Sequence, residues 1–137
     1  MKAWLVDTGP LVALLDADDA HHAWAVEQAK AITSVVATCE AVVAETLFLL
    51  HRKGCRGDDV FELVEAGFLR CDFDFRQEHR QVRKLMRSYQ DQPMSFADAC
   101  LVRMAELRPE ACVWTLDRDF KIYRLHRRQT ISLVSPW

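Results

Sequence analysis

The chain has 137 residues, a hydrophobic fraction of 50% and a formal net charge of −2. This size and composition allow one domain to bury its own core without disulfides or metals. The five cysteines are odd in number and include no C-x-x-C pair, so we expect reduced core residues rather than a disulfide framework. They are Cys39, Cys55, Cys71, Cys100 and Cys112.

No leader with a charged and then an apolar part opens the sequence. No apolar run approaches the roughly 20 residues that a membrane-spanning helix needs. The sequence therefore predicts a single domain over residues 1–137, without membrane contact and located in the cytoplasm.

Charge is distributed unevenly along the chain. Residues 1–69 hold 5 Lys or Arg against 11 Asp or Glu, whereas residues 70–137 hold 13 against 9. An acidic pocket beside a basic surface would give this pattern and would suit a metal-dependent nuclease. Ordinary solvated faces give it as well.

Short apolar runs alternate with helix-forming segments in chain order. The first run meets Asp7 and Pro10, which are typical of a helix start, and Pro93 breaks the chain before a later helix. The predicted strands are residues 3–6, 35–37, 69–72, 111–116 and 131–134. The predicted helices are residues 11–15, 20–32, 39–52, 58–66, 76–90, 95–107 and 117–124.

Strands that alternate with helices imply right-handed crossover connections and a mostly parallel sheet with helices on both faces. We therefore expect an α/β fold, a three-layer α/β/α sandwich. Open sheets of this kind bind ligands outside the carboxyl ends of their strands, so the residues directly after each strand are the first candidates for function.

Two acids follow predicted strands directly. Asp7 comes after the first strand and Asp117 after the run 111–116, so a parallel sheet would place both at the same edge. Each also precedes a predicted helix, where a short polar side chain accepts hydrogen bonds from free backbone N–H groups. Taken singly, each is explained by helix capping.

Glu45 has mainly apolar neighbours three and four positions away in its helix, including Ala41, Val42, Phe48 and Leu49. This spacing predicts a carboxylate on an apolar face. A buried carboxylate costs several kcal/mol unless a metal ion, a basic residue or a proton compensates its charge.

Asp98 lies three residues after Ser95, the spacing of a capping box at a helix start. Leu101 and Val102 share its helix face, so burial beside a metal is an equally good interpretation. Both remain open for this segment taken alone.

Together the four acids, Asp7, Glu45, Asp98 and Asp117, give two carboxylates at one sheet edge and two on otherwise apolar helix faces. Their convergence would make an oxygen-rich site for a hard divalent cation such as Mg²⁺, with Mn²⁺ as a second candidate. Such sites serve phosphoryl chemistry.

These segments also resemble a known family. The opening Asp7-Thr8-Gly9-Pro10-Leu11 is similar to the first motif of PIN domains, particularly VapC-like toxins of type II toxin-antitoxin systems. The runs around the other three acids resemble the later motifs in the same order, and the similarity spans nearly the whole chain. These three runs are Val42-Val43-Ala44-Glu45-Thr46-Leu47, Ser95-Phe96-Ala97-Asp98-Ala99 and Thr115-Leu116-Asp117-Arg118-Asp119-Phe120.

The resemblance implies a single PIN domain that hydrolyses RNA phosphodiesters with a carboxylate-bound Mg²⁺ or Mn²⁺. Asp7 and Asp98 would hold the principal ion, while Glu45 and Asp117 would complete the acidic cavity. Cleavage would leave 5′-phosphate and 3′-hydroxyl ends. The implied partners are an antitoxin whose tail covers the active-site groove and a second copy of the chain in a homodimer.

Further polar residues have two interpretations each. Thr8 and Thr115 would orient the carboxylates or serve the backbone alone. Asp119 would join the site or, with somewhat better support, only favour the positive end of a helix. Arg or Lys residues of the segments 76–87 and 121–128 would bind RNA phosphates or remain solvated. The five histidines show no metal-ligand spacing, and we expect them to be structural or surface residues.

Other functions deserve comparison. A phosphatase that forms an aspartyl-phosphate would use Asp7, but Gly9 stands where a second acid would be expected, and the run 111–116 has no lysine. A degenerate PIN fold that only binds RNA or protein would not explain four retained acids. A phosphoacceptor domain gives no function to Glu45 or Asp98.

Overall fold

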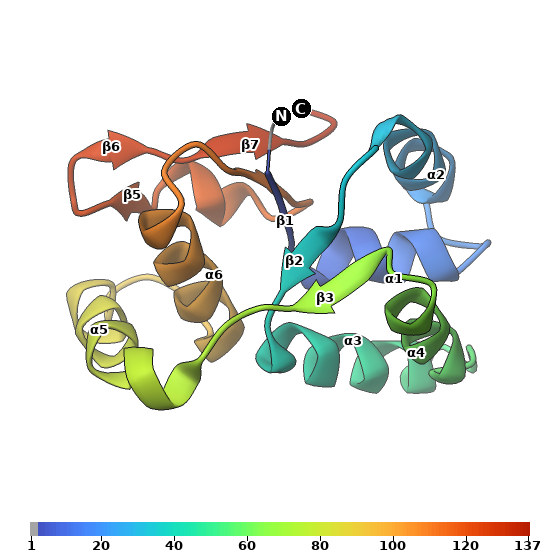
Figure 1. The fold of residues 1–137 in the computed structure, drawn as a ribbon, viewed down its shortest axis with the longest axis horizontal. Helices are drawn as coiled ribbons and strands as arrows, with labels where there is room; N and C mark the ends of the chain where they lie inside the picture. Colours follow the sequence, from blue (N-terminus) through green and yellow to red (C-terminus); the bar gives the residue numbers. More distant parts are fainter. Residues whose placement is uncertain (1–2) are drawn as a thin grey trace.

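A parallel sheet forms the centre of the computed structural model, which describes residues 3–137. Its strands run in the order β3-β2-β1-β4-β7, and every neighbouring pair is parallel (Figure 1). The strands are β1 Trp4–Val6, β2 Val36–Thr38, β3 Leu69–Cys71, β4 Cys112–Trp114 and β7 Ser132–Val134. Each coincides with an apolar run of the sequence, as predicted.

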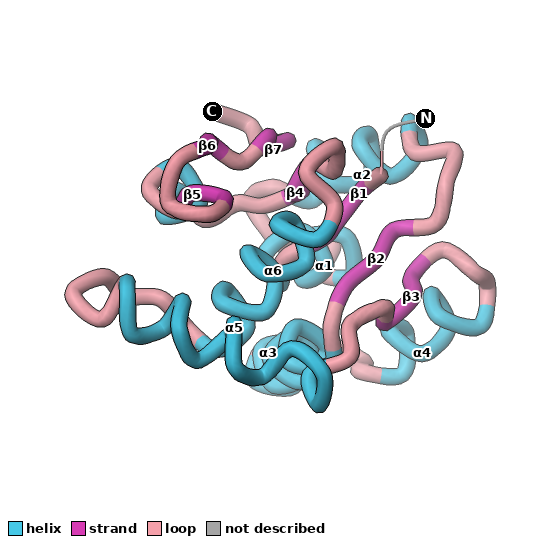
Figure 2. Tube along the Cα trace, turned by 60° about the vertical axis from the view of Figure 1, so that its left-hand side comes forward, coloured by secondary structure: helices cyan, strands magenta, loops and turns pink. Residues whose placement is uncertain are grey.

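Helices connect these strands and cover both faces of the sheet. The chain adds β2 and β3 on one side of β1 and then returns to add β4 on the other side. Right-handed crossovers therefore place α5 and α6 on the face opposite the earlier helices (Figures 1 and 2). The helices are α1 Thr8–Leu15, α2 His22–Ala31, α3 Glu40–Arg52, α4 Asp58–Glu65, α5 Phe75–Ser88 and α6 Phe96–Leu107. The expected three-layer α/β/α architecture is confirmed.

The two central strands supply the middle of the core. Leu5, Val6, Val113 and Trp114 have no exposed surface. The Trp114 ring meets two other tryptophan rings edge to face, with ring centroids 6.0 and 6.4 Å away. This packing fixes the pairing of β1 with β4, which sets the positions of the residues that follow both strands.

One predicted element is wrong. The expected helix over residues 117–124 is only a 3₁₀ turn, η1 Arg118–Lys121, and the chain then forms a hairpin of β5 Arg124–Leu125 and β6 Gln129–Thr130. Strands of two residues are too short to show an alternating pattern, so no local pattern predicts this hairpin. The other predicted elements are present, with ends that differ by a few residues.

Cys39, Cys55, Cys71 and Cys100 form no disulfide within residues 3–137. Cys39, Cys100 and Cys112 are buried, as expected of core residues, while Cys55 and Cys71 are only half-buried. Within residues 3–137, none of the helices combines the length and the apolar character that crossing a membrane requires.

The Trp114 packing gives a test of the core. We expect Trp114→Ala to lower the free energy of unfolding by about 3–5 kcal/mol, because it removes a large, fully buried side chain and leaves a cavity. Urea denaturation followed by circular dichroism measures the change. Phe48→Ala is the matched control, since the Phe48 side chain is 58% exposed and its loss should change stability by less than about 1 kcal/mol. Equal effects of both variants would contradict this description of the core.

Candidate metal centre

Asp7 lies directly after β1, and its buried carboxylate has a defined orientation. Oδ1 accepts a hydrogen bond from the Thr8 backbone N–H at 2.8 Å, and Oδ2 accepts one from the Thr115 hydroxyl at 2.8 Å. The Thr115 oxygen in turn accepts from the backbone N–H of Asp117 at 2.9 Å. Thr115 therefore links the ends of β1 and β4. These bonds confirm that Thr115 orients a carboxylate, one of the two roles considered from the sequence.

Asp117 follows β4 at the same edge of the sheet. Its Oδ1 accepts a hydrogen bond from the backbone N–H of Asp119 at 2.9 Å. Gly9 lets the first turn of α1 approach this edge closely, since a Cβ at Gly9 would lie 3.1 Å from the Leu116 Cβ.

Asp98 reaches the same region from the first turn of α6. The expected capping box is present: Ser95 Oγ accepts from the Asp98 N–H at 3.0 Å, and Asp98 Oδ2 accepts from the Ser95 N–H at 3.3 Å. The fully buried Tyr123 donates its hydroxyl proton to the same Oδ2 at 2.9 Å. Two donors therefore hold one oxygen of this carboxylate in place.

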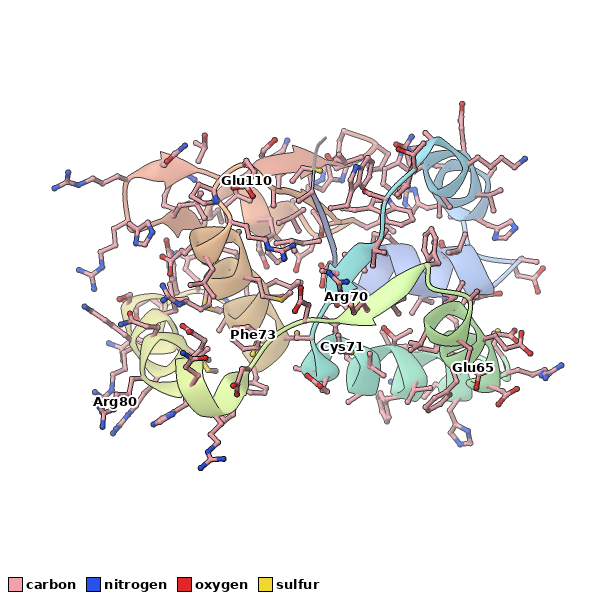
Figure 3. The ribbon with its side chains drawn as sticks, in the orientation of Figure 1. Glu65, Arg70, Cys71, Phe73, Arg80 and Glu110 are labelled. Atoms are coloured by element: carbon pink, nitrogen blue, oxygen red, sulfur yellow. The ribbon has the colours of Figure 1, made fainter. Side chains whose placement is uncertain are left out.

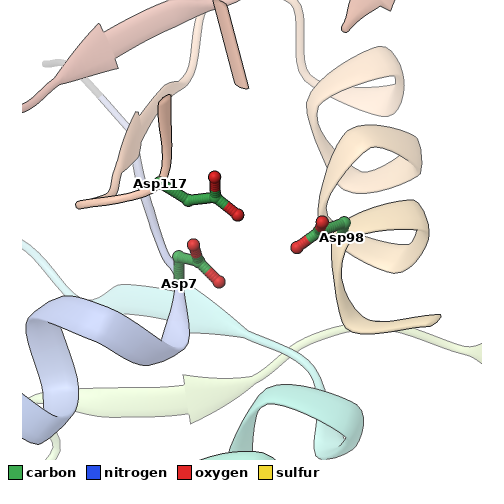
Figure 4. Close-up of side chains that lie close together, drawn as sticks. All are labelled: Asp7, Asp98 and Asp117. Atoms are coloured by element: carbon green, nitrogen blue, oxygen red, sulfur yellow. The ribbon is translucent and has the colours of Figure 1, made fainter. Parts of the chain in front are cut away.

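The three aspartates converge although they come from distant parts of the chain. One carboxylate oxygen from each of Asp7, Asp98 and Asp117 lies within 4.8 Å of the others, and the side chains point toward a common space (Figure 4). They border an open cavity of about 400 Å³. Its other lining residues are Thr8, Gly9, Glu45, Leu49, Leu116 and Arg118.

The closeness of these acids changes their titration. Burial raises the pKa of Asp7 from its ordinary 3.8 to about 7; hydrogen bonds from Thr115 and Thr8 partly oppose this shift, and the charges of Asp98 and Asp117 add to it. Burial also raises the pKa of Asp98, although the Tyr123 hydroxyl favours its charged form. The site thus concentrates negative charge where solvation is poor.

No cation within the described part of the chain compensates this charge, because none of its ion pairs involves Asp7, Asp98 or Asp117. The buried Thr8 hydroxyl at the cavity makes no hydrogen bond of normal geometry to residues 3–137, although it lies near enough to Glu45 to lower the pKa of that carboxyl. An all-oxygen donor set with unbalanced charge and an unused buried hydroxyl fits a hard divalent cation.

The expectation that Glu45 is buried on an apolar helix face is wrong. Glu45 and Phe48 are exposed, and α3 packs into the core through Val42, Thr46 and Leu50 instead. Glu45 lines the mouth of the cavity but is outside the three-aspartate group. Partial burial and the charges of Asp98 and Asp117 still raise its pKa.

Helix capping and metal binding are compatible interpretations of the aspartates, because each carboxylate accepts from local backbone and also faces the shared cavity. Asp119 donates its N–H to Asp117 and is outside the group, although burial and the nearby Asp117 carboxylate raise the pKa of its own carboxyl. Sequence analysis missed Tyr123 as a partner of Asp98. An isolated tyrosine 25 positions away carries no motif that would have identified it.

A sequence comparison with curated proteins finds none that matches. Among solved structures, the toxin VapC20 of Mycobacterium tuberculosis, described as cleaving the sarcin-ricin loop, superposes with a TM-score of 0.77 and 24% identity. The superposition covers 88% of this chain and 94% of VapC20, which shows a common fold. The family model of the PIN domain matches residues 4–125, and the chain belongs to the PIN domain family.

Proposed function

We propose that this chain, as a single PIN domain over residues 1–137, is a metal-dependent endoribonuclease and the toxin of a VapBC-type toxin-antitoxin pair. The observation that carries the proposal is the convergence of Asp7, Asp98 and Asp117 within 4.8 Å without a compensating cation among residues 3–137. The PIN family is one of ribonucleases, and the similarity in fold to a toxin that cleaves RNA supports the same substrate class.

In this proposal Asp7, Asp98 and Asp117 hold Mg²⁺, or Mn²⁺ in its place. When bound, the ion supplies a water of lowered pKa for attack on phosphorus and offsets the charge on the departing oxygen. Tyr123 and Ser95 orient the Asp98 carboxylate, and Thr115 orients Asp7 together with the backbone of Asp117.

Two charged residues at the cavity complete the proposed machinery. Glu45, at the mouth, has a raised pKa, so its carboxylate is suited to accept a proton close to the aspartates. Arg118 lines the same cavity and is exposed, which suits its guanidinium to hold a phosphate oxygen of the substrate. We infer an antitoxin and a second copy of the chain as partners, and a cytoplasmic location.

The first prediction concerns cleavage. A mixed RNA pool should be cut by the purified protein with Mg²⁺ or Mn²⁺, leaving 5′-phosphate and 3′-hydroxyl ends, and should stay intact in EDTA. Asp7→Asn and Asp98→Asn should each lower the rate at least roughly 100-fold, because each removes one ligand charge. Gel analysis of end-labelled RNA measures both effects.

Asp18→Asn is the matched control for that experiment, since Asp18 is exposed on the loop after α1 and away from the cavity. Its activity should equal that of the unmodified protein. Cleavage that persists in EDTA, or that survives both site substitutions in folded protein, would refute the nuclease proposal.

A second prediction follows from the raised pKa of Asp7. Between about pH 4 and pH 7 the folded protein keeps a proton on Asp7 that the unfolded chain has lost, so the free energy of unfolding falls as pH rises through this window. Above pH 7 Asp7 is charged in both states, and the folded protein bears the full cost of the buried charge. Asp7→Asn should therefore stabilise the metal-free protein at pH 8 by roughly 1–3 kcal/mol and have little effect at pH 4.

Urea denaturation in EDTA across this pH range measures the difference between the two proteins. Adding Mg²⁺ at pH 8 should raise the stability of the unmodified protein more than that of the variant, since only the former keeps the full ligand set. The stability of the variant minus that of the unmodified protein should therefore rise from pH 4 to pH 8. A difference that falls instead would contradict the buried charge at Asp7.

A third prediction separates Tyr123 from general packing. Tyr123→Phe removes the hydroxyl that orients Asp98 but keeps the buried ring, so Mn²⁺ affinity should fall roughly 10-fold. The control is Tyr89→Phe, because the Tyr89 hydroxyl accepts from the Arg124 N–H and, among residues 3–137, forms no hydrogen bond with a carboxylate. Calorimetric Mn²⁺ titration compares them. The same affinity in both variants would remove Tyr123 from the proposed site.

A further inference from the structure

The exposed side of α5 carries a dense group of cations. Arg76, Arg80, Arg83, Lys84 and Arg87 are all exposed, and none of them takes part in an ion pair within residues 3–137. Figure 3 shows the labelled Arg80 on α5, pointing away from the body of the protein among other nitrogen-tipped side chains. We call these five residues the α5 cation row.

Two acids near this row, Glu78 and Glu106, are engaged elsewhere. Glu78, on α5 itself, accepts from Arg103 Nε at 2.7 Å. Glu106 accepts from Arg103 at 3.2 Å and from the backbone N–H of His126 at 2.8 Å. Their charges are used in holding α6 against α5 and the β5–β6 hairpin.

A groove of about 210 Å³ lies beside the α5 cation row, between α5 and the hairpin. Lys84 and Ser88 line it from α5, and His126 and Arg127 line it from the hairpin turn. The Arg127 guanidinium donates to the Ser88 hydroxyl across the groove. Cations from two elements therefore border one concave surface.

The hairpin turn has an unfavourable sequence for its conformation. The N–H of Arg128 donates to the Leu125 carbonyl at 3.0 Å, and the two central residues, His126 and Arg127, have φ of 49° and 66°. This is a type I′ turn, which favours Asn-Gly or Asp-Gly because both central residues need positive φ. Basic residues at these positions lower stability, so a contribution to binding is a physical reason for their presence.

The C-terminal end of α5 lies close to the metal centre in the fold. The residue after α5, Tyr89, packs its ring on Tyr123 with centroids 5.2 Å apart, and the buried Tyr123 donates its hydroxyl proton to Asp98. Two tyrosine rings therefore separate the end of the α5 cation row from one of the proposed catalytic aspartates.

We propose that the groove and the α5 cation row bind the phosphate backbone of the RNA substrate outside the cleaved bond. The choice of RNA rests on the proposed function, since the same charges would also attract an acidic protein. The short distance in the fold between the end of α5 and Asp98 favours RNA. An acidic cavity repels a phosphate chain, and a remote cationic surface offsets that repulsion.

The first experiment measures RNA binding in EDTA, so that it does not depend on cleavage. Lys84→Gln/Arg87→Gln should weaken binding of a long labelled RNA about 10-fold by fluorescence anisotropy. The slope of log Kd against log salt should fall by about 0.7 for each charge removed. An RNA of a few nucleotides should bind much more weakly than the long RNA, because it contacts fewer of these cations.

Arg56→Gln/Arg70→Gln is the matched control, because both arginines are exposed and each pairs with an aspartate. It removes the same charge and should leave RNA affinity within about two-fold of the unmodified protein. An equal loss in both double variants would mean that only net charge attracts RNA, and it would overturn the proposal.

The second experiment uses the turn. His126→Asn/Arg127→Gly should raise the melting temperature by about 3–6 °C, since the new residues suit a type I′ turn, while long RNA binds about 3- to 10-fold more weakly. Weaker binding by a more stable protein cannot come from misfolding.

Two further results would overturn the inference. The first is unchanged RNA affinity in both groove variants, and the second is a bound poly-glutamate peptide that the long RNA fails to displace. The last result would assign the surface to an acidic protein. RNA that binds through the groove but is not cut with Mg²⁺ would refute the nuclease proposal and leave this inference standing.

Discussion

The pairing of β1 with β4 is the contact on which the site depends. Val6 lies opposite Trp114 in the parallel register, so Asp7 emerges beside Thr115, and the Thr115 hydroxyl joins Asp7 to the backbone of Asp117. The sheet reverses its strand order between these two strands. A parallel sheet leaves room for a ligand at such a point, because the connections from the two strands diverge.

The carboxylates at this edge give local stability and lower global stability at the same time. Each accepts a hydrogen bond from a free backbone N–H group at the start of a helix or turn. Their shared burial, however, raises the pKa of Asp7 to about 7, so the ionised form is held at a cost to the folded state. A bound cation would offset this cost. Capping alone would not require three acids to lie close together.

Acidic and basic groups are separated across the molecule. The acidic cavity holds aspartates from three elements, and the exposed side of α5 carries cations that form no ion pair within residues 3–137. A metal alone would need only the first feature. A polyanionic substrate needs both, because its phosphates must be attracted overall while one of them approaches an acidic centre.

The sequence by itself determined the alternation of strands and helices, and hence a parallel α/β/α sandwich with Asp7 and Asp117 at one edge. These results follow from local patterns, since apolar runs and capping residues act within a few positions of the chain. The ordered motifs around the acids also identified the family, whose model matches residues 4–125.

Only the tertiary structure decided which side chains meet. Asp98 joins the two strand-end aspartates because α6 packs across the sheet, and Tyr123 reaches it from a segment 25 positions away. Helical periodicity placed Glu45 on a buried face, but α3 packs through Val42, Thr46 and Leu50 and leaves Glu45 exposed. The β5–β6 hairpin and its strained turn depend likewise on contacts with α5 and α6, which no local pattern of residues 117–130 contains.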